Sequence, residues 1–292
     1  MNRWLAIACL IGMGAGWGVT NPLSKIAVSG GYQHFGIIFW QLVIGAGLLS
    51  FLSVLRGKGL PLSPQHLRFY LFIALVGTVL PNWASYTAVT HLPAGILSIG
   101  IASVPIFAFP IAILLGEDRF GVVRLGGILA GLAGVALLIG PDTSLPDPAM
   151  AVFIPLAFLG PFFYAVEGNV VAKWGTVGLD PVQVLLGAST VGAMIALPLA
   201  LWFGVFIDPR PPWGIEDAAA VASSVIHIAV YTVYVWVVSR AGATFGTQVG
   251  YLVTGFGVVW AMLLLGESYS TWVWAVMGLI LFGMFLVQPR SR

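Results

Sequence analysis

Three residues near the start of the chain combine an aromatic ring, an amide and an amine at a spacing that brings them together. Trp17, Asn21 and Lys25 are four residues apart within an apolar run at 4–28, so on a helix they form one stripe. An indole stacks on apolar groups, an amide exchanges hydrogen bonds and an ammonium pairs with an anion. This chemistry suits recognition of a small molecule. The structural alternative is a packed ring, an interhelical hydrogen bond and a lysine that snorkels to a membrane edge.

Proline and polar residues interrupt several apolar runs in the same way. Pro22 follows Asn21, and in hydrocarbon a backbone group freed by proline needs a neighbouring helix or a water-filled cavity, so this stripe is predicted to face inward. His227, Tyr231 and Tyr234 fall at i, i+4 and i+7, which is again one helix face. The residues predicted to bind the small molecule are Trp17, Asn21, Asn82, Trp83, Tyr86, Ser98, Tyr164, Asn169, His227, Tyr231, Tyr234, Gln248 and Tyr251.

Ionisable residues inside the apolar runs are few, and such residues are functional candidates by default. Lys25, Glu167 and His227 are therefore predicted to take part in gating or coupling. A neutral His227 that hydrogen-bonds between helices is the structural alternative. The sequence places no pair of carboxylates in mid-span, so steep coupling to protons or sodium is not expected.

The motifs that would indicate an enzyme or a bound cofactor do not occur in the sequence. A single cysteine, Cys9, excludes an internal disulfide and a thiolate metal cluster. There is no H-E-x-x-H or G-x-S-x-G motif, and the glycine-rich stretch 12–18 does not match G-x-G-x-x-G. We therefore expect no enzymatic activity, no cofactor, no metal site and no nucleic-acid partner.

The elements that carry these residues are predicted to be membrane helices. Hydrophobic residues make up 59% of the 292 positions and charged residues 8%, whereas soluble domains carry about 25% charged residues. A membrane-spanning helix needs about 20 apolar residues. Ten apolar runs approach this length, at 4–28, 35–55, 67–89, 94–115, 121–139, 150–171, 182–206, 218–238, 244–265 and 271–287. The sequence therefore predicts an all-α membrane protein with ten transmembrane helices.

Small residues indicate where these helices approach one another. Glycines four positions apart let two helix backbones come close. Such pairs occur at 12 and 16, at 127 and 131 and at 246 and 250. Close helix contacts are predicted at all three pairs.

Lysine and arginine separate between the two sides of the predicted bundle. With ten helices, Lys25 and Arg210 fall on one side and the remaining ten of the 12 basic residues on the other. Cytoplasmic loops carry the excess of such residues. Both termini are therefore predicted to be cytoplasmic, in a protein of the cytoplasmic (inner) membrane.

The two halves of the chain can be laid on each other. A shift of 148 residues aligns Asn21 with Asn169, Lys25 with Lys173 and Tyr86 with Tyr234, and a shift of 150 aligns Glu117 with Glu267. Five helices per half is an odd number, so the second copy must enter the membrane from the opposite side. The prediction is two inverted five-helix repeats, 1–140 and 149–292, joined by a loop at 141–148 and enclosing a central cavity.

Three stretches of the sequence carry a resemblance to a known family. WGVTNPLSK (17–25), YTAVTHLPAGILSIGIASVPIF (86–107) and Leu-Gly-Glu (115–117) together resemble the EamA-type drug/metabolite transporter superfamily, over nearly the whole chain. The resemblance implies ten helices in two inverted repeats, a central cavity and export of small metabolites. The length and the aromatic-rich spans are similar to those of amino-acid exporters of the YddG type.

An interior rich in aromatic rings and amides with little fixed charge would bind apolar side chains by stacking and ammonium groups by cation–π contact. The sequence thus predicts a secondary transporter that exports small metabolites, in particular neutral or aromatic amino acids, by alternating access. Export of another class, such as a drug or a sugar derivative, a passive channel and a non-transporting scaffold remain open alternatives. The expected partners are the small-molecule substrate and membrane lipid, and the oligomeric state is left open.

Overall fold

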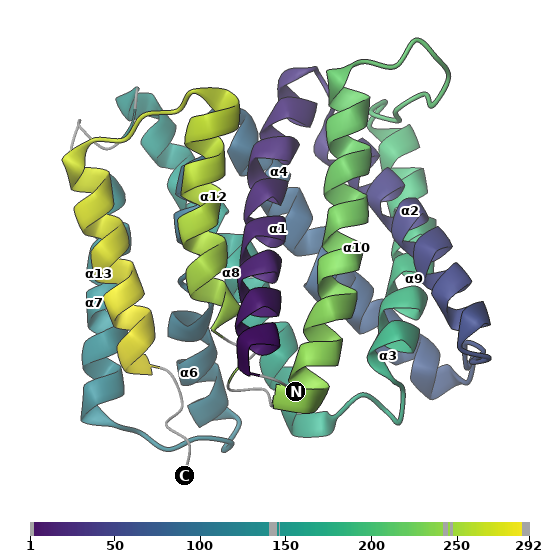
Figure 1. The fold of residues 1–292 in the computed structure, drawn as a ribbon, viewed down its shortest axis with the longest axis horizontal. Helices are drawn as coiled ribbons and strands as arrows, with labels where there is room; N and C mark the ends of the chain where they lie inside the picture. Colours follow the sequence, from purple (N-terminus) through teal and green to yellow (C-terminus); the bar gives the residue numbers. More distant parts are fainter. Residues whose placement is uncertain (1–2, 140–144, 146, 242–244, 246–247, 288–292) are drawn as a thin grey trace.

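The computed structural model is a bundle of helices packed side by side (Figure 1). It describes residues 3–139, 145, 147–241, 245 and 248–287. No β-strand occurs among these residues, which confirms the prediction of an all-helical protein for this part of the chain. Most of the predicted inter-repeat loop at 141–148 lies outside the described residues.

The first half of the chain forms helices that run in sequence through the bundle. They are α1 (Arg3–Ser29), α2 (His34–Leu55), α3 (Pro64–Ala74), α4 (Leu80–His91), α5 (Ala94–Ile101), α6 (Val104–Leu114) and α7 (Val122–Ile139). A π-helical turn, η1 (Leu75–Val79), joins α3 to α4 without a break. The sequence did not indicate this turn, which holds one residue more per hydrogen-bonded ring than an α turn.

The second half forms a similar series. The helices are α8 (Ile154–Trp174), preceded by the 3-10 segment η2 (Pro148–Phe153), then α9 (Pro181–Trp202), α10 (Ile215–Ala241), α12 (Val249–Leu265) and α13 (Thr271–Val287).

Local sequence signals explain several helix ends. Asp180 caps α9, because its carboxylate accepts from the backbone N–H groups of Val182 and Gln183, while the Gln183 side chain accepts from the backbone N–H of Asp180. This reciprocal pair is a capping box. Gly266 ends α12 with a φ of +66°, which favours glycine.

Seven helical stretches are long and apolar enough to cross a membrane, among them Pro64–His91, which contains η1, and Ala94–Leu114. Three shorter apolar helices, Val122–Leu138, Val249–Leu265 and Thr271–Val287, have 10–17 residues. The prediction of a helical membrane protein is therefore confirmed. Seven clear spans are fewer than the ten predicted, because these three shorter helices fall slightly below a full crossing length.

The helices of the two halves pack against each other in a reciprocal pattern. Helix α1 packs against α10 and α12 of the second half, while α8 packs against α4, α5 and α6 of the first half. Helix α2 packs against α9, and α7 against α13. Figure 1 shows α1, in purple, between α12 and α10. Every one of these contacts joins segments that are far apart in the sequence.

Glycines bring some of these helices together, though not all of the predicted ones. A Cβ on Gly127 would lie 2.7 Å from the backbone oxygen of Gly283, so α7 and α13 touch through their backbones as predicted. At the first pair Gly12 has nothing within 4 Å, but a Cβ on Gly16 would lie 2.5 Å from Val230 Cγ2 of α10, so the close contact occurs at Gly16. At the third pair Gly246 lies outside the described residues, and Gly250 has nothing within 4 Å. Helix α1 also meets α12 at Gly18, where a Cβ would lie 2.8 Å from the backbone nitrogen of Gly257.

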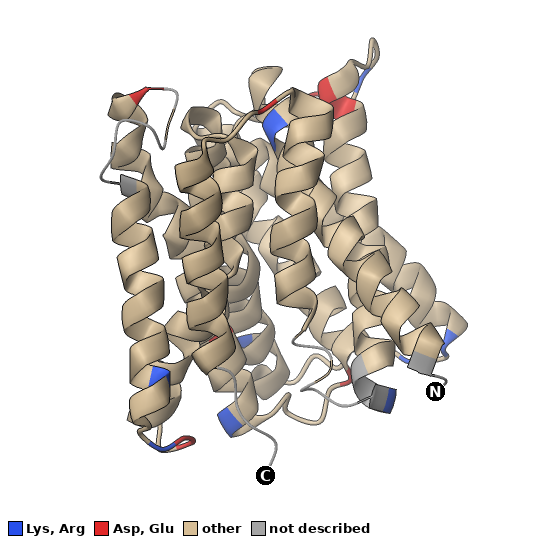
Figure 2. Cartoon of the chain, turned by 60° about the vertical axis from the view of Figure 1, so that its left-hand side comes forward, with Lys and Arg blue, Asp and Glu red and all other residues tan. Residues whose placement is uncertain are grey.

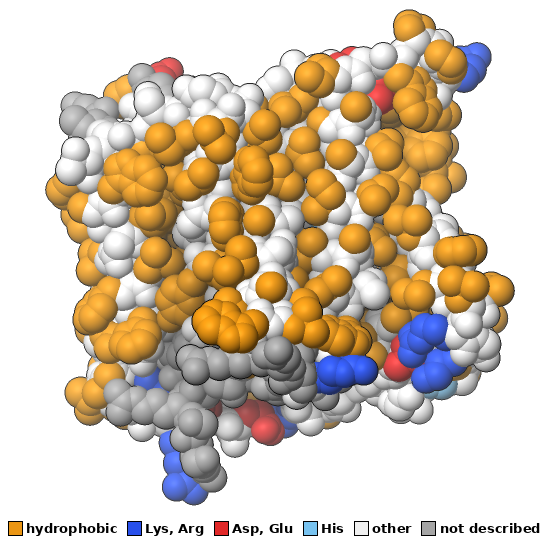
Figure 3. Space-filling model, in the orientation of Figure 1, with side chains coloured by type: hydrophobic (Ala, Val, Ile, Leu, Met, Phe, Trp, Pro, Cys, Tyr) orange, Lys and Arg blue, Asp and Glu red, His pale blue; other side chains and the backbone are white. Residues whose placement is uncertain are grey.

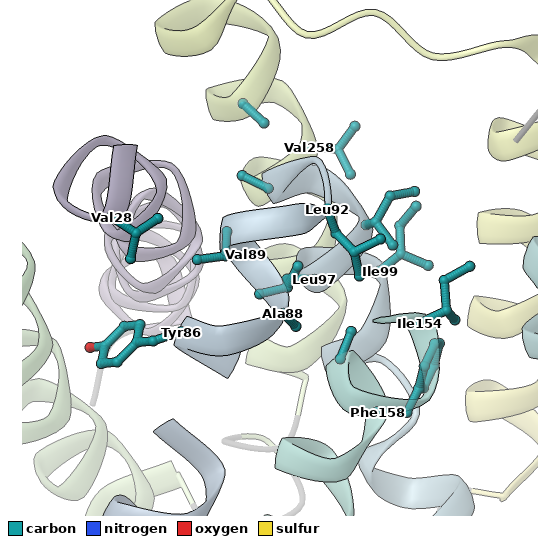
Figure 4. Packing of buried hydrophobic residues seen from close by; sticks show 14 of the residues in the cluster. Val28, Tyr86, Ala88, Val89, Leu92, Leu97, Ile99, Ile154, Phe158 and Val258 are labelled. Carbon is teal, nitrogen blue, oxygen red and sulfur yellow. The ribbon is translucent and has the colours of Figure 1, made fainter. Parts of the chain in front are cut away.

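The buried core lies where α4 turns into α5. Figure 4 shows Leu92 and Ile99 packed with Val28 of α1, Phe158 of α8 and Val258 of α12. Both Leu92 and Ile99 are fully buried. This junction therefore touches helices of both halves.

Large apolar side chains also cover the outside of the bundle, as the face in Figure 3 shows. Trp202 is 86% exposed and Leu114 is 85% exposed. Soluble monomers rarely expose contiguous apolar patches above a few hundred Å². Lipid is the solvent that suits this surface.

Basic residues gather at one end of the bundle (Figure 2). We call this the basic end, and it comprises Arg56, Lys58, Arg68, Arg119, Arg124, Lys173 and Arg240, where α1 begins and α13 ends. Lys25 and Arg210 lie at the opposite end, near the last turn of α1 and after α9. The predicted separation of the positive charges is thus present in the described residues.

Candidate functional site

Four side chains from α1 and α10 form an aromatic group between the two halves. The Trp17 ring centroid lies 6.1 Å from that of His227, 6.4 Å from that of Tyr231 and 5.4 Å from that of Tyr234. The Tyr231 and Tyr234 centroids are 6.2 Å apart. These distances and tilted planes are typical of favourable aromatic pairs. As the spacing predicted, His227, Tyr231 and Tyr234 lie on one face of α10, and that face contacts Trp17.

Trp17 holds an unused hydrogen-bond donor in this group. Its Nε1–H is buried and has no partner in the described part of the chain, and the same is true of the Tyr251 hydroxyl on α12. A buried donor without a partner costs free energy. The aromatic group is therefore chemically incomplete as it stands.

A second polar group joins α2, α4 and α8. The Gln41 Oε1 atom accepts from the Tyr86 hydroxyl at 2.6 Å and from Asn82 Nδ2 at 3.2 Å. The Tyr164 hydroxyl lies 3.5 Å from Asn82 Oδ1. Sequence reasoning missed Gln41, although a lone glutamine in the middle of the apolar run 35–55 was a usable signal. Trp83, on the same helix as Asn82, packs half-buried against the core.

Other predicted residues serve as polar connections between helices. Asn21 Nδ2 donates to Ser98 Oγ at 2.9 Å, and the fully buried Ser98 donates in turn to the Ala94 oxygen. Asn169 Nδ2 donates to the backbone oxygens of Ala108 and Ala165. These bonds match the structural alternative given for such amides, and direct substrate contact by Asn21, Ser98 and Asn169 stays a prediction. Gln248 lies at the N-cap of α12.

The opposite end is fastened by a lysine and a glutamate, which we call the end clasp. Lys25 Nζ donates to the oxygens of Val89 at 2.6 Å and Leu92 at 3.1 Å, at the end of α4. Glu267, after α12, accepts from the backbone N–H groups of Ala94 at 2.7 Å and Gly95 at 3.2 Å. A carboxylate is favoured at a helix N-terminus. Glu267 thereby ties the second half to the α4–α5 junction of the first.

Tyr269 supports the end clasp. Its hydroxyl donates to Glu267 and accepts from the Gly95 N–H group at 3.1 Å. Burial raises the pKa of Tyr269, and the neighbouring Glu267 carboxylate raises it further. The hydroxyl therefore stays protonated and remains a donor to Glu267.

The matching residues at the basic end are held differently. Lys173 is exposed and donates to the Leu115 oxygen. Glu117 is exposed as well, and its side chain has no partner among the described residues.

A groove of about 280 Å³ opens between α2, α9 and α10 at the basic end. Its lining includes Leu52, Arg56, Asp180, Tyr231 and Trp236. Tyr231 therefore belongs both to this groove and to the aromatic group. The groove and the aromatic group thus share one side chain.

Glu167 on α8 is a carboxylate inside the bundle without a partner. It is half-buried, and no donor or cation among the described residues pairs with it. A Cβ on Gly77, in η1, would lie 2.6 Å from Glu167 Oε1. Tyr164 lies three residues before Glu167, so the two side chains lie on one face of α8. Nowhere in the described residues do three His, Cys, Asp or Glu side chains gather as a metal site would require.

Comparison with known proteins gives one family along the chain. The model of the EamA-like transporter family matches residues 4–140 and again residues 152–288. The two matches begin at the same offset that aligns Asn21 with Asn169.

Individual relatives are transporters by name. The chain is 27% identical to the uncharacterized inner membrane transporter YedA of Escherichia coli (strain K12), over 93% of this chain and 86% of the relative. It is 26% identical to the uncharacterized transporter YvbV of Bacillus subtilis (strain 168), over 94% and 89%. A solved crystal structure superposes with a TM-score of 0.66 and 18% identity, covering 98% of this chain and 96% of that one, which shows the fold alone.

Proposed function

Since the chain belongs to the EamA-like transporter family, we propose that it exports small neutral or aromatic amino acids across the cytoplasmic membrane by alternating access. The family and the names of the relatives make it a membrane transporter and not an enzyme. The substrate class and the mechanism are our proposal.

The aromatic group carries the proposal. Trp17, His227, Tyr231 and Tyr234 present ring faces together with the unpartnered Nε1–H of Trp17. Ring faces bind apolar side chains by stacking and attract ammonium groups. An amino acid with an apolar or aromatic side chain offers both partners and a carboxylate acceptor for the indole N–H. A sugar phosphate would instead need several free cations, and Lys25 is already engaged in the end clasp.

Two inverted five-helix repeats around a central cavity are the proposed architecture, with all ten helical stretches crossing the membrane. Support comes from the two family matches at a constant offset and from the reciprocal packing of α1 and α8 on the other half. The proposed domains remain 1–140 and 149–292. Transporters built this way bind substrate between the repeats and rock one against the other.

The basic end is proposed to face the cytoplasm. Loops rich in lysine and arginine stay on that side. Helix α1 begins and α13 ends there, so both termini are assigned to the cytoplasm. The groove beside Tyr231 would then admit substrate from inside the cell, as export requires.

Purified protein in liposomes tests the proposal with a panel of labelled amino acids, a drug cation and a sugar derivative, with and without a pH gradient. Saturable amino-acid flux with counterflow is expected, and it would identify a carrier. Flux that does not saturate would indicate a channel, and no flux of any compound would indicate a scaffold. Flux of the drug cation or the sugar derivative without any amino-acid flux would overturn the substrate assignment.

Two tryptophan variants test the site itself. Trp17→Ala should weaken apparent affinity about fivefold or more, because a stacking surface and a buried donor each contribute on the order of 1 kcal/mol. Trp202→Ala is the matched control, since Trp202 is 86% exposed toward lipid. A Trp17→Ala variant that folds poorly but binds with unchanged affinity would assign Trp17 to packing only.

A further inference from the structure

Glu167 is a carboxylate inside the bundle whose chemistry the proposed function has not yet used. It lies on α8, two turns before the helix ends at Trp174. Its carboxylate has no hydrogen-bond donor and no cation among the described residues. Removing a carboxylate from water without a partner is costly. The position therefore calls for a positively charged or donating partner that the described residues do not provide.

The surroundings of Glu167 narrow the nature of this partner. Tyr164 lies three residues before Glu167 on α8, so the two side chains lie on one face of this helix. Helix α4 packs against both α8, which carries Glu167, and α1, which carries Trp17, and Tyr231 packs edge-on against Trp17 at a centroid distance of 6.4 Å. A carboxylate combined with electron-rich ring faces is a receptor for an organic cation. A hydrated metal ion would need further oxygen ligands, and no group of three His, Cys, Asp or Glu side chains gathers around Glu167 in the described residues.

We propose that Glu167 binds the protonated amine of the substrate, so that the transported compounds are primary amines with an apolar or aromatic body, amino acids among them. The proposal rests on the proposed function. The ammonium group donates to the Glu167 carboxylate while the side chain stacks on the rings of the aromatic group. In an amino acid the second charged group, the carboxylate, accepts from the unpartnered Trp17 Nε1–H. Glu167 and the Trp17 Nε1–H group thereby each gain the partner that their chemistry requires.

The π turn η1 makes room for this carboxylate. Gly77 lies in η1, and a Cβ added there would sit 2.6 Å from Oε1 and 2.8 Å from Oε2 of Glu167. A methyl group at residue 77 would therefore displace the end of a flexible side chain rather than backbone. Gly168 is the neighbour of Glu167 on α8, and a Cβ added there would have nothing within 4 Å. Alanine at residue 168 leaves the carboxylate where it is.

Equilibrium binding to the full-length protein in detergent tests the assignment with three related probes. They are an aromatic amino acid, the corresponding amine that lacks the carboxyl group, and the corresponding acid that lacks the amino group. The amino acid and the amine should bind, and the acid should bind at least about tenfold more weakly, since it cannot place a charge-assisted donor on Glu167.

Two variants disturb the carboxylate in independent ways, because one replaces it and the other displaces it. Glu167→Gln keeps the side-chain volume and should weaken binding of the amino acid and the amine about tenfold or more, while binding of the acid stays the same or improves. Gly77→Ala should weaken the same two probes, and Gly168→Ala should bind all three as the parent protein does. Size-exclusion profiles report folded yield, and Gly77→Ala keeps the test available if Glu167→Gln does not fold.

The outcomes separate this inference from the proposed function. Loss of amine binding in Glu167→Gln supports the inference even if amino acids are not transported, in which case the proposed function fails alone. Wild-type binding of the amine in both folded variants would overturn the inference while leaving amino-acid export intact. Equal binding of the acid and the amine by the parent protein would overturn it as well.

Discussion

The two ends of the bundle hold equivalent residues in different ways. At the opposite end Lys25 is half-buried and bonded to the end of α4, and Glu267 bonds across the halves to the start of α5. At the basic end Lys173 and Glu117 are both exposed, and the groove beside Tyr231 opens there. Identical residue types at matching repeat positions thus do not imply matching contacts. Under the proposed alternating-access cycle, the bonds of Lys25 and Glu267 correspond to a state in which the α4–α5 junction is fastened at the opposite end.

Removing Glu267 should produce the largest effect, because Glu267 bonds across the two halves, whereas the bonds of Lys25 lie within the first half. Hydrogen bonds to a charged group contribute about 1.5–3 kcal/mol, so Glu267→Ala should shift the balance between closed and open states roughly 10- to 100-fold. Ser98→Cys in a Cys9→Ser background reports the shift, since Ser98 is fully buried. Labelling of this cysteine by a membrane-impermeant thiol reagent should accelerate when Glu267 is replaced. An unchanged labelling rate would show that the end clasp does not hold that end closed.

Removing Lys25 should have a smaller effect of the same sign. Lys25→Met loses the bonds to Val89 and Leu92 but leaves Glu267 on the α5 N-terminus. Both bonds lie within the first half and hold the end of α4 rather than the contact between the halves, so we expect only about 1 kcal/mol to bear on closure and an increase in the same labelling rate of about fivefold. An effect larger than that of Glu267→Ala would assign the closure to the lysine instead.

Asp180 gives the basic end a pH dependence that can be measured. Burial pushes the pKa of Asp180 upward, but its bonds to Arg56 at 3.0 Å and Lys58 at 2.9 Å outweigh burial and lower the pKa to about 2. The unfolded value is about 3.9, so the stabilisation is complete above that pH and is lost as the pH falls toward 2. Thermal unfolding between pH 6 and pH 2 should therefore show a modest acid loss that Asp180→Asn lacks. Parallel pH profiles for parent and variant would contradict this account.

Removing Lys173 should have the smallest effect and serves as the matched control for Lys25. Its side chain is exposed, and exposed charged contacts contribute about 0–1 kcal/mol. Lys173→Met should change labelling and transport rate less than about threefold. A change as large as that from Lys25→Met would mean that the two ends are held alike, and the comparison would fail.

The sequence predicted the fold class and part of the site for physical reasons that can be named. Long apolar runs indicate membrane helices whatever their neighbours, and i, i+4, i+7 spacing places His227, Tyr231 and Tyr234 on one face without knowledge of the partner helix. That face does meet Trp17. Contacts between distant segments were harder to predict from the sequence. An amide such as Asn21 is the same residue in the sequence whether it bonds to a substrate or to Ser98.

Two features owe their role to packing, which the sequence pattern does not give. Gln41 gains its importance from Asn82 and Tyr86 on another helix, and pairing of this kind depends on tertiary packing. The turn η1 adds one residue to a helix without changing the apolar composition of the run. Its relation to Glu167 follows from the packing of α8, which no local periodicity specifies.

The turn η1 also has a genetic consequence. A π turn accommodates one additional residue while the flanking helices keep their faces, so loss of one codon within Leu75–Val79 would restore a continuous α-helix. Loss of one codon elsewhere in Pro64–His91 would rotate every later side chain by about 100°. Deletion scanning of this helix should therefore recover membrane-inserted protein mainly from Leu75–Val79. The same deletions would move Gly77 away from Glu167. Deletions at these five codons should therefore give protein that is folded and inserted but inactive.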